Sequence, residues 1–135
     1  MRPFFPFLPS LSGLVTEILQ DTHVAQRARL RLVILESPYA GDIEANVAYA
    51  RRCLRDSLLR GEAPIASHLL YTQPGVLDDG VLAQRTAGIE AGLAWRRVAD
   101  ASVVYTDRGI SSGMQLGIEA ARDAGLAVEF RSIGA

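Results

Sequence analysis

The sequence predicts an α/β fold, a small doubly wound parallel sheet of the Rossmann or flavodoxin-like type. Short apolar runs alternate with helical patterns along the chain, and glycines mark the ends of the helical segments. The run over residues 103–114, VVYTDRGISSGM, passes from a strand to a helix through a glycine-containing turn. Since strands and helices alternate throughout, we expect parallel strands joined by right-handed crossovers.

The composition is that of an ordinary globular protein. The chain has 135 residues, of which 49% are hydrophobic and 21% charged, enough for one domain with a buried core. The formal net charge is −1 and the 14 basic residues are scattered, without the basic stripe that nucleic-acid polymers require. Arg51 and Arg52 share a predicted helix with acidic residues, so we assign them to its solvated face. We expect no nucleic-acid polymer as a partner.

Residues 1–29 are predicted to form an N-terminal arm and a short helix, ahead of an α/β domain over 30–135. Three prolines interrupt the apolar first ten residues, which are too few to span a bilayer, and a modest helical pattern follows over 14–29. The arm is either a segment that packs on a partner subunit or upstream sequence added by an early start codon. We expect a cytoplasmic protein that does not bind membranes.

The first strand is predicted over 32–36, an apolar run that ends in the loop SPYAG. The next helix extends to Gly61, because apolar residues recur at spacings of three and four up to this stop signal. Cys53 lies in the middle of that helix with no flanking histidine or asparagine, which predicts a small core residue rather than a reactive thiol.

The second half of the chain continues the alternation. A short strand over 63–67 leads into a long loop over 68–80, and a helix follows over 82–97. A strand over 101–106, a helix over 112–124 and a last strand over 126–131 complete the pattern. The loop over 68–80 exceeds the usual length of a strand–helix connection, and long loops on the ligand side of such folds are often functional.

Loops that leave the carboxyl ends of parallel strands converge at one edge of the sheet, where ligands bind. The residues that these loops bring there are Glu36, Ser37, Tyr39, Gly41 and Asp42 from the first, His68, Tyr71 and Gln73 from the second, and Asp107, Ser111, Ser112 and Gly113 from the third, with Glu119 farther along the next helix. Each has an ordinary structural interpretation as a turn, cap or solvated residue, but together they favour a small polar ligand with a sugar or phosphate group. Free N–H groups at the helix start near Ser112 favour phosphate.

The strand, the loop with Tyr39 and Gly41, and the pattern from Asp107 through Ser-x-Gly to Glu119 resemble the nucleoside 2-deoxyribosyltransferase-like superfamily. Residues 31–131 are most similar to its small, largely uncharacterised bacterial and phage members. The resemblance implies a doubly wound parallel sheet that binds nucleosides or nucleotides. It also implies a glutamate that attacks the anomeric carbon of the N-glycosidic bond.

Carried over by residue, Tyr39 and Gly41 match the loop on the sugar and phosphate side, and Asp107 matches the strand-end carboxylate. Ser112 and Gly113 match the phosphate-binding turn, and His68 and Gln73 are expected to face the base. The superfamily pattern places the glutamate about four residues after Gly113, where this chain has Gly117.

Glu119 is the nearest carboxylate on the helix and the predicted nucleophile. Two residues of helix, however, rotate a side chain by about 200°. Either the helix start is shifted so that Glu119 reaches the site, or Asp107 or Glu36 acts as the catalytic carboxylate in its place.

The leading prediction is an N-glycosidase or 2-deoxyribosyltransferase-like enzyme that uses Glu119, Asp107 and Tyr39. One cysteine and two distant histidines form no metal-ligand cluster, and neither a metal nor an organic cofactor is expected. A non-catalytic protein that senses or sequesters a nucleotide is the alternative, which a glycine at position 117 favours. An interaction protein with a vestigial crevice is a third.

A homo-oligomer is expected, because the apolar arm and Trp95 supply hydrophobic surface. The resemblance further implies that neighbouring subunits complete the active site.

Overall fold

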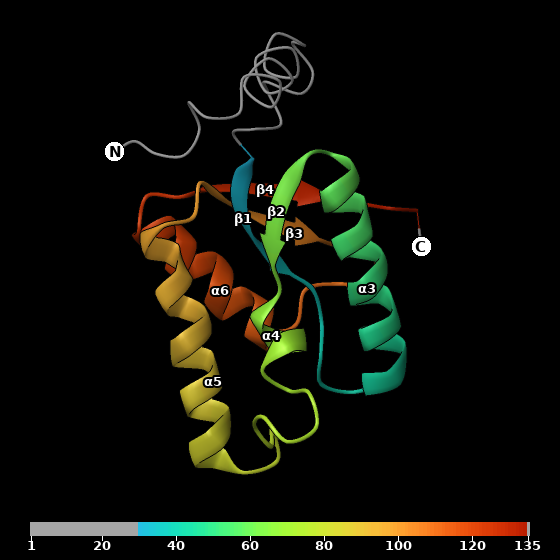
Figure 1. Ribbon diagram of the computed structural model, residues 1–135, viewed down its shortest axis with the longest axis vertical. Coiled ribbons are helices and arrows are strands. Elements are labelled where there is room, and N and C mark those ends of the chain that lie inside the picture. Colours follow the sequence, from blue (N-terminus) through green and yellow to red (C-terminus); the bar gives the residue numbers. More distant parts are fainter. Residues whose placement is uncertain (1–29, 135) are drawn as a thin grey trace, which may run out of the picture. The chain divides into compact units, whose positions relative to one another are not determined.

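The computed structural model describes residues 30–134. The predicted arm and helix over 1–29 lie outside the described residues. The elements, in chain order (Figure 1), are β1 (Arg31–Glu36), α3 (Ile43–Leu59), β2 (Glu62–Ile65), α4 (Ser67–Leu70), α5 (Leu82–Ala94), the 3-10 turn η2 (Trp95–Arg97), β3 (Ala101–Tyr105), α6 (Ser112–Asp123) and β4 (Ala127–Arg131).

The four strands form one parallel sheet in the order β2-β1-β3-β4. Helix α3 lies on one side of this sheet and helices α5 and α6 lie on the other, as Figure 1 shows. The predicted fold class, an α/β protein with a doubly wound parallel sheet, is therefore confirmed. The chain order reverses between the central strands β1 and β3, and open α/β sheets bind ligands at the carboxyl ends of the strands beside such a switch point.

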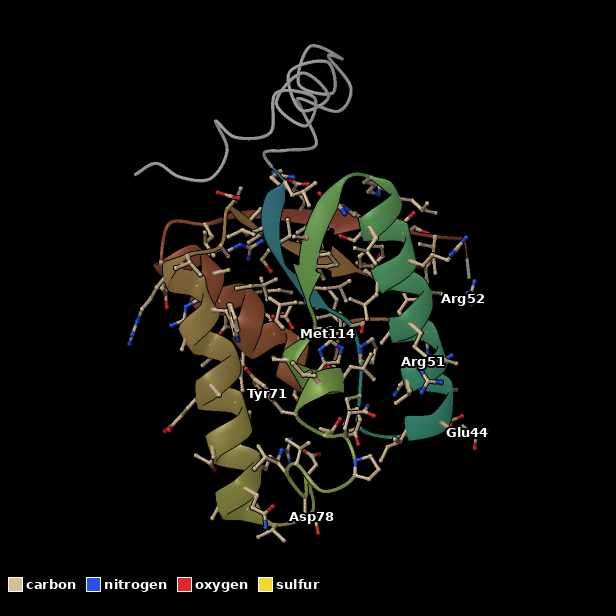
Figure 2. All side chains as sticks on the ribbon, in the orientation of Figure 1. Glu44, Arg51, Arg52, Tyr71, Asp78 and Met114 are labelled. Carbon is tan, nitrogen blue, oxygen red and sulfur yellow. The ribbon has the colours of Figure 1, made fainter. Side chains whose placement is uncertain are left out.

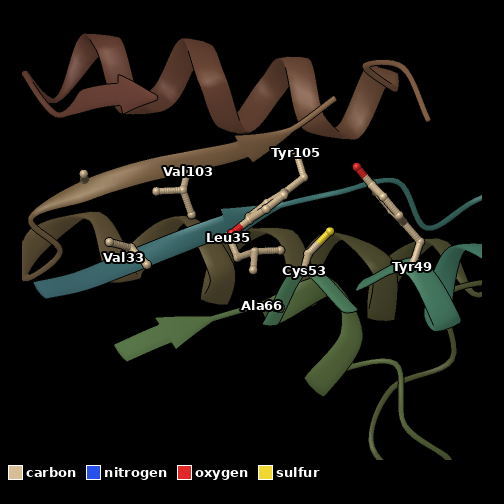
Figure 3. Packing of buried hydrophobic residues seen from close by; sticks show 8 residues of the cluster. Val33, Leu35, Tyr49, Cys53, Ala66, Val103 and Tyr105 are labelled. Carbon is tan, nitrogen blue, oxygen red and sulfur yellow. The ribbon is translucent and has the colours of Figure 1, made fainter. Parts of the chain in front are cut away.

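The face of the sheet that α3 covers holds the main core. Val33, Leu35, Val103 and Tyr105 alternate with residues of the opposite face and are almost fully buried. Figure 3 shows how they pack with Cys53 and other members of this cluster. Cys53 is completely buried, so its prediction as a small core residue is confirmed, and burial raises the pKa of its thiol to about 12.

On the same face, a buried ion pair joins side chains of the two edge strands, β2 and β4. Arg131 of β4 donates to the Glu62 carboxylate through Nη1 at 2.7 Å and Nη2 at 2.6 Å, and the Ser57 hydroxyl of α3 donates to it at 2.8 Å. Hydrogen bonding by Arg131 is the main cause that lowers the pKa of Glu62. Pro64 fits in β2 because this edge strand pairs on one side only.

Two elements differ from the predicted pattern. The four-residue helix α4 occupies the beginning of the predicted 68–80 loop, and the predicted 82–97 helix ends as the 3-10 turn η2. A helix this short has no hydrophobic period and depends on tertiary contacts. Here Ser67 of α4 packs against Gly92 of α5, where an added Cβ would lie 2.4 Å from the Ser67 hydroxyl oxygen.

In the part of the chain that the structure describes, the helices fall short of the length and apolar character that crossing a membrane requires.

Candidate functional site

A cavity of about 170 Å³ lies between the sheet and the helices α5 and α6. β1, β3 and the loops after them contribute to its wall, together with α4, the long loop before α5, and the inner sides of α5 and α6. Tyr71 and Met114, labelled in Figure 2, are two of the side chains that line it. Trp95 holds Tyr71 in place by donating from Nε1 to the tyrosine hydroxyl at 2.9 Å. The cavity reaches the β1–β3 switch point, where the fold predicts a ligand site.

Glu36, the last residue of β1, lies on the cavity side of the sheet because its neighbour Leu35 faces α3. Its carboxylate lies against Gly117 of α6. A Cβ built on Gly117 would be 2.1 Å from Glu36 Oε2 and 2.6 Å from Cδ. The carboxylate therefore occupies space that a side chain at position 117 would need.

Burial raises the pKa of Glu36 to about 8, because the charged carboxylate loses its water in this position. At pH 7 the group is therefore mostly protonated in the protein without ligand. A carboxyl group whose pKa is close to the working pH is suited to exchange a proton during catalysis or to donate a hydrogen bond.

Ser37, in the loop after β1, and His68, in the short helix α4, meet on the same cavity. Ser37 Oγ lies 2.7 Å from His68 Nε2, and the tautomer of the ring decides which of the two donates. Burial lowers the pKa of His68 to about 4, so the imidazole is neutral at pH 7. The expected convergence of the first two loops is present here.

The N-terminus of α6 forms another part of the wall. Ser111 is the N-cap, and its hydroxyl oxygen accepts from the Met114 backbone N–H at 3.2 Å. Besides Glu36, seven residues that the sequence predicts at this edge line the cavity: Ser37, Tyr39, His68, Tyr71, Ser111, Ser112 and Gly113. The structure thus brings together residues from all three loops.

Three predicted ligand-binding residues lie outside the lining of this cavity and have structural contacts instead. Gly41 takes a left-handed conformation, φ +99°, in the turn before α3. Asp42 caps α3 by accepting from the Ala45 backbone N–H at 3.2 Å. The Gln73 amide donates to the Leu69 carbonyl oxygen at 2.9 Å. Each forms a turn or cap of the kind that polar loop residues commonly supply.

Asp107, predicted as a catalytic carboxylate, also lies outside the cavity lining. It accepts from the Tyr49 hydroxyl at 2.7 Å and from the backbone N–H groups of Ile133 and Gly134, each at 3.0 Å. Tyr49 belongs to α3, so these contacts are on the side of the sheet opposite the cavity. Through these hydrogen bonds, the carboxylate connects the segment after β4 to the end of β3.

Glu119, the predicted nucleophile, is exposed on α6 and does not line the cavity. Its carboxylate accepts from the Gln115 amide at 3.0 Å, one helical turn earlier. Gly117 is buried and lines the cavity, and the helix turns Glu119 about 200° away from it. The carboxylate that does line the cavity beside α6 is Glu36, which the sequence offered only as an alternative.

Other cavity residues were not singled out from the sequence: Arg85, Gly88, Gly92, Arg96 and Ser102. The first four of these lie three or four residues apart along α5 and η2, so they share one helix face. A glycine inside a helix costs roughly 1 kcal/mol relative to alanine. Gly88 and Gly92 were therefore a usable signal of close packing. Among the described residues, no group of three or more histidine, cysteine or acidic side chains could hold a metal ion.

The fold and the cavity define a doubly wound α/β protein with a cavity at the switch point of its sheet. The chain belongs to the family described as a domain of unknown function (DUF7768), which matches residues 31–131. A comparison with proteins of curated function found no match.

A solved structure with a similar fold is the 2-deoxyribosyltransferase of the psychrotolerant bacterium Bacillus psychrosaccharolyticus. The two chains share 22% sequence identity with a TM-score of 0.54, over 75% of this chain and 72% of that one. That enzyme is described as a biocatalyst for the synthesis of antiviral and antitumoral nucleosides. The predicted resemblance to the 2-deoxyribosyltransferases is therefore confirmed at the level of the fold.

Proposed function

We propose that this protein cleaves or transfers at the N-glycosidic bond of a nucleoside or nucleotide, with Glu36 as the attacking carboxylate. One observation carries the proposal: the Glu36 carboxylate fills the space beside Gly117. The superfamily pattern expects a glutamate at position 117. In this chain a carboxylate reaches the same space from the neighbouring strand β1.

In the proposed reaction an oxygen of ionised Glu36 bonds to the anomeric carbon as the C–N bond breaks. The base leaves with the electrons of that bond and takes up a proton. Water or a second base then attacks the glycosyl ester and restores the carboxylate, which gives hydrolysis or transfer respectively. Tyr39 is proposed to contact the sugar, and the neutral His68 and Tyr71 to contact the base.

Relocating the carboxylate tests this assignment. Glu36→Gln should lower the turnover number by roughly 10⁴-fold, as loss of a nucleophile does, measured as base release from nucleosides and their 5′-monophosphates by chromatography. Glu36→Ala should be equally inactive, and adding Gly117→Glu to it should restore part of the activity by returning a carboxylate to the same space. Full activity in Glu36→Gln would contradict the proposal.

A non-catalytic nucleotide-binding protein is the second candidate, and the raised pKa of Glu36 favours it. A protonated carboxyl group donates a hydrogen bond to a ligand but does not attack carbon. For an enzyme, kcat/KM should rise with pH up to about 8 as Glu36 ionises. Binding by calorimetry without base release between pH 6 and pH 9.5 would instead support the binding protein.

Self-association is also proposed. Leu82, Ile89 and Trp95 are exposed apolar residues on and directly after α5. Light scattering at micromolar concentration should show an oligomer, and a monomer would contradict this part of the proposal.

A further inference from the structure

Two side chains of the cavity wall have buried polar atoms that lack a hydrogen-bond partner within residues 30–134. These atoms are Nε and Nη1 of Arg96 and Oγ of Ser102. Ser102, on β3, is 1% exposed. Folded proteins pair nearly all such atoms, because a buried unpaired donor costs free energy. Their occurrence on one cavity indicates a ligand group that supplies the missing partners.

The charge of Arg96 specifies the chemistry of that group. Ion pairs in the described part of the chain are made by Arg31, Arg60 and Arg131, and none is made by Arg96. A guanidinium group has only donors, so its partner must be an acceptor, and an anion would also balance the charge. Ser102 lines the same cavity, and its hydroxyl can also donate to an anion. Phosphate oxygens meet both requirements.

The sheet register places Ser102 relative to Glu36. Glu36 is in register with Val104 of β3, and Ser102 lies two residues earlier on the same face, in register with Ile34. Two strand residues correspond to about 7 Å, so Ser102 lies roughly that far deeper along the sheet than Glu36. The sugar ring and the 5′ carbon can span this separation between an anomeric carbon and a phosphate.

We infer that Arg96 and Ser102 form a subsite for the 5′-phosphate of a nucleoside monophosphate, with the anomeric carbon of the same ligand at Glu36. The identity of the ligand rests on the proposed function, whereas the anion subsite rests on Arg96 and Ser102 alone. This position differs from the phosphate site that the sequence predicts at the start of α6. There, the Ser111 hydroxyl already accepts from the Met114 backbone N–H.

Calorimetry on the full chain tests the subsite with three probes: inorganic phosphate, the common nucleosides, and their 5′-monophosphates. Arg96→Gln should weaken binding of a monophosphate by about tenfold or more, the usual effect of losing a charge-assisted hydrogen bond, and leave the nucleoside unaffected. Arg97→Gln is the matched control, because Arg97 is the adjacent exposed arginine outside the cavity lining. It should change neither affinity.

Ser102→Ala provides a second, independent variant. It should also weaken monophosphate binding, while the melting temperature of the unliganded protein stays the same or rises, because the removed hydroxyl has no partner there. A lower melting temperature together with unchanged monophosphate affinity would show that Ser102 serves the fold, and would overturn its part in the subsite.

The possible outcomes separate the subsite from the proposed function. Equal loss of nucleoside and monophosphate affinity in Arg96→Gln would overturn the phosphate assignment, as would a monophosphate preference that depends on Ser112 and not on Arg96. If inorganic phosphate binds and Arg96→Gln abolishes it while no nucleotide binds, the subsite is supported and the nucleotide ligand is refuted. If neither phosphate nor any monophosphate binds the folded protein, the subsite is refuted, whatever Glu36 does.

Discussion

The two faces of the central sheet differ sharply in how they are covered. On the α3 face, Leu35, Val103 and Tyr105 pack with Tyr49 and Cys53 of α3 into a closed core. On the opposite face, the alternate positions of β1 and β3 include Glu36 and Ser102, which line a cavity together with residues of α5 and α6. Because side chains alternate along a strand, the same two strands supply a core to one helix layer and part of a cavity wall to the other.

The helices of the two layers differ accordingly. α3 presents large side chains to the sheet, and α6 packs Met114 and Ile118 against Val104. Beside the cavity, however, α5 and α6 present Gly88, Gly92 and Gly117. Polar groups follow the same division. Glu62 and Arg131 are paired on the α3 face, while polar atoms of Arg96 and Ser102 have no partner within residues 30–134. The α3 face is packed and its buried charges are paired, whereas the opposite face keeps an unfilled cavity beside polar atoms that have no partner among the described residues.

Removing a side chain should therefore cost far more in the closed core on the α3 face than at a half-exposed position of the cavity wall. Leu35→Ala should lower the free energy of unfolding by about 2–5 kcal/mol, because Leu35 is 1% exposed and its loss leaves a void. Leu116→Ala is the control on α6, since Leu116 lines the cavity but is 52% exposed, and should cost less than about 1 kcal/mol. Urea denaturation measures both. Equal losses would show that the cavity face is packed as tightly as the core.

The two faces should also respond differently to pH, because Glu36 is a titratable group buried on the cavity side. Its pKa is raised from 4.5 to about 8 in the folded protein. Its contribution to stability is therefore fully present below pH 4.5 and is lost as the pH rises to about 8. Glu36→Gln, which stays neutral, should be more stable than the parent by about 2–4 kcal/mol at pH 8.5 and about equal to it at pH 4.5. If the free energy of unfolding depended on pH in the same way for both proteins, burial would be refuted as the cause of the raised pKa of Glu36.

Gly117→Ala should reveal how closely Glu36 approaches α6. The new Cβ would lie 2.1 Å from Glu36 Oε2, so the carboxylate must move, at a cost of about 1–3 kcal/mol. Gly113→Ala is the control on the same helix, because a Cβ there would lie 3.9 Å from the Ser111 hydroxyl oxygen, an ordinary contact distance, and it should be neutral or slightly stabilising. Combining Gly117→Ala with Glu36→Ala should recover most of the loss in thermal unfolding. If Gly117→Ala lowered the stability equally with glutamate and with alanine at position 36, the contact between Glu36 and Gly117 would be excluded.

The smallest effect is expected at Glu119, which is exposed on α6 and pairs with Gln115. Glu119→Gln should change stability by less than about 0.5 kcal/mol and leave base release unchanged. A large loss of base release with an unchanged melting temperature would restore Glu119 as the nucleophile, and would contradict the assignment of Glu36.

Much of this fold was predictable from local sequence patterns. The apolar run that ends at Glu36 predicted β1, the spacing of apolar residues before Gly61 predicted α3, and the Ser111 start predicted α6. The convergence of Ser37, His68 and Ser112 also followed from the sequence, because parallel strands end at one edge of the sheet. Helix α4 was missed, since its four residues depend on a contact with Gly92 rather than on a repeat.

The sequence by itself determined the alternation of strands and helices, the burial of Cys53 and the loops that meet at the ligand edge. Only the tertiary structure decided which carboxylate lines the cavity. Asp107, Glu119 and Glu36 all lie at positions where the sequence pattern allows a catalytic carboxylate. In the structure, Asp107 binds the backbone after β4, Glu119 is exposed, and Glu36 lies against Gly117. The physical reason is that the periods of strands and helices fix the direction of a side chain within its own element, whereas its neighbours come from elements far away in the sequence.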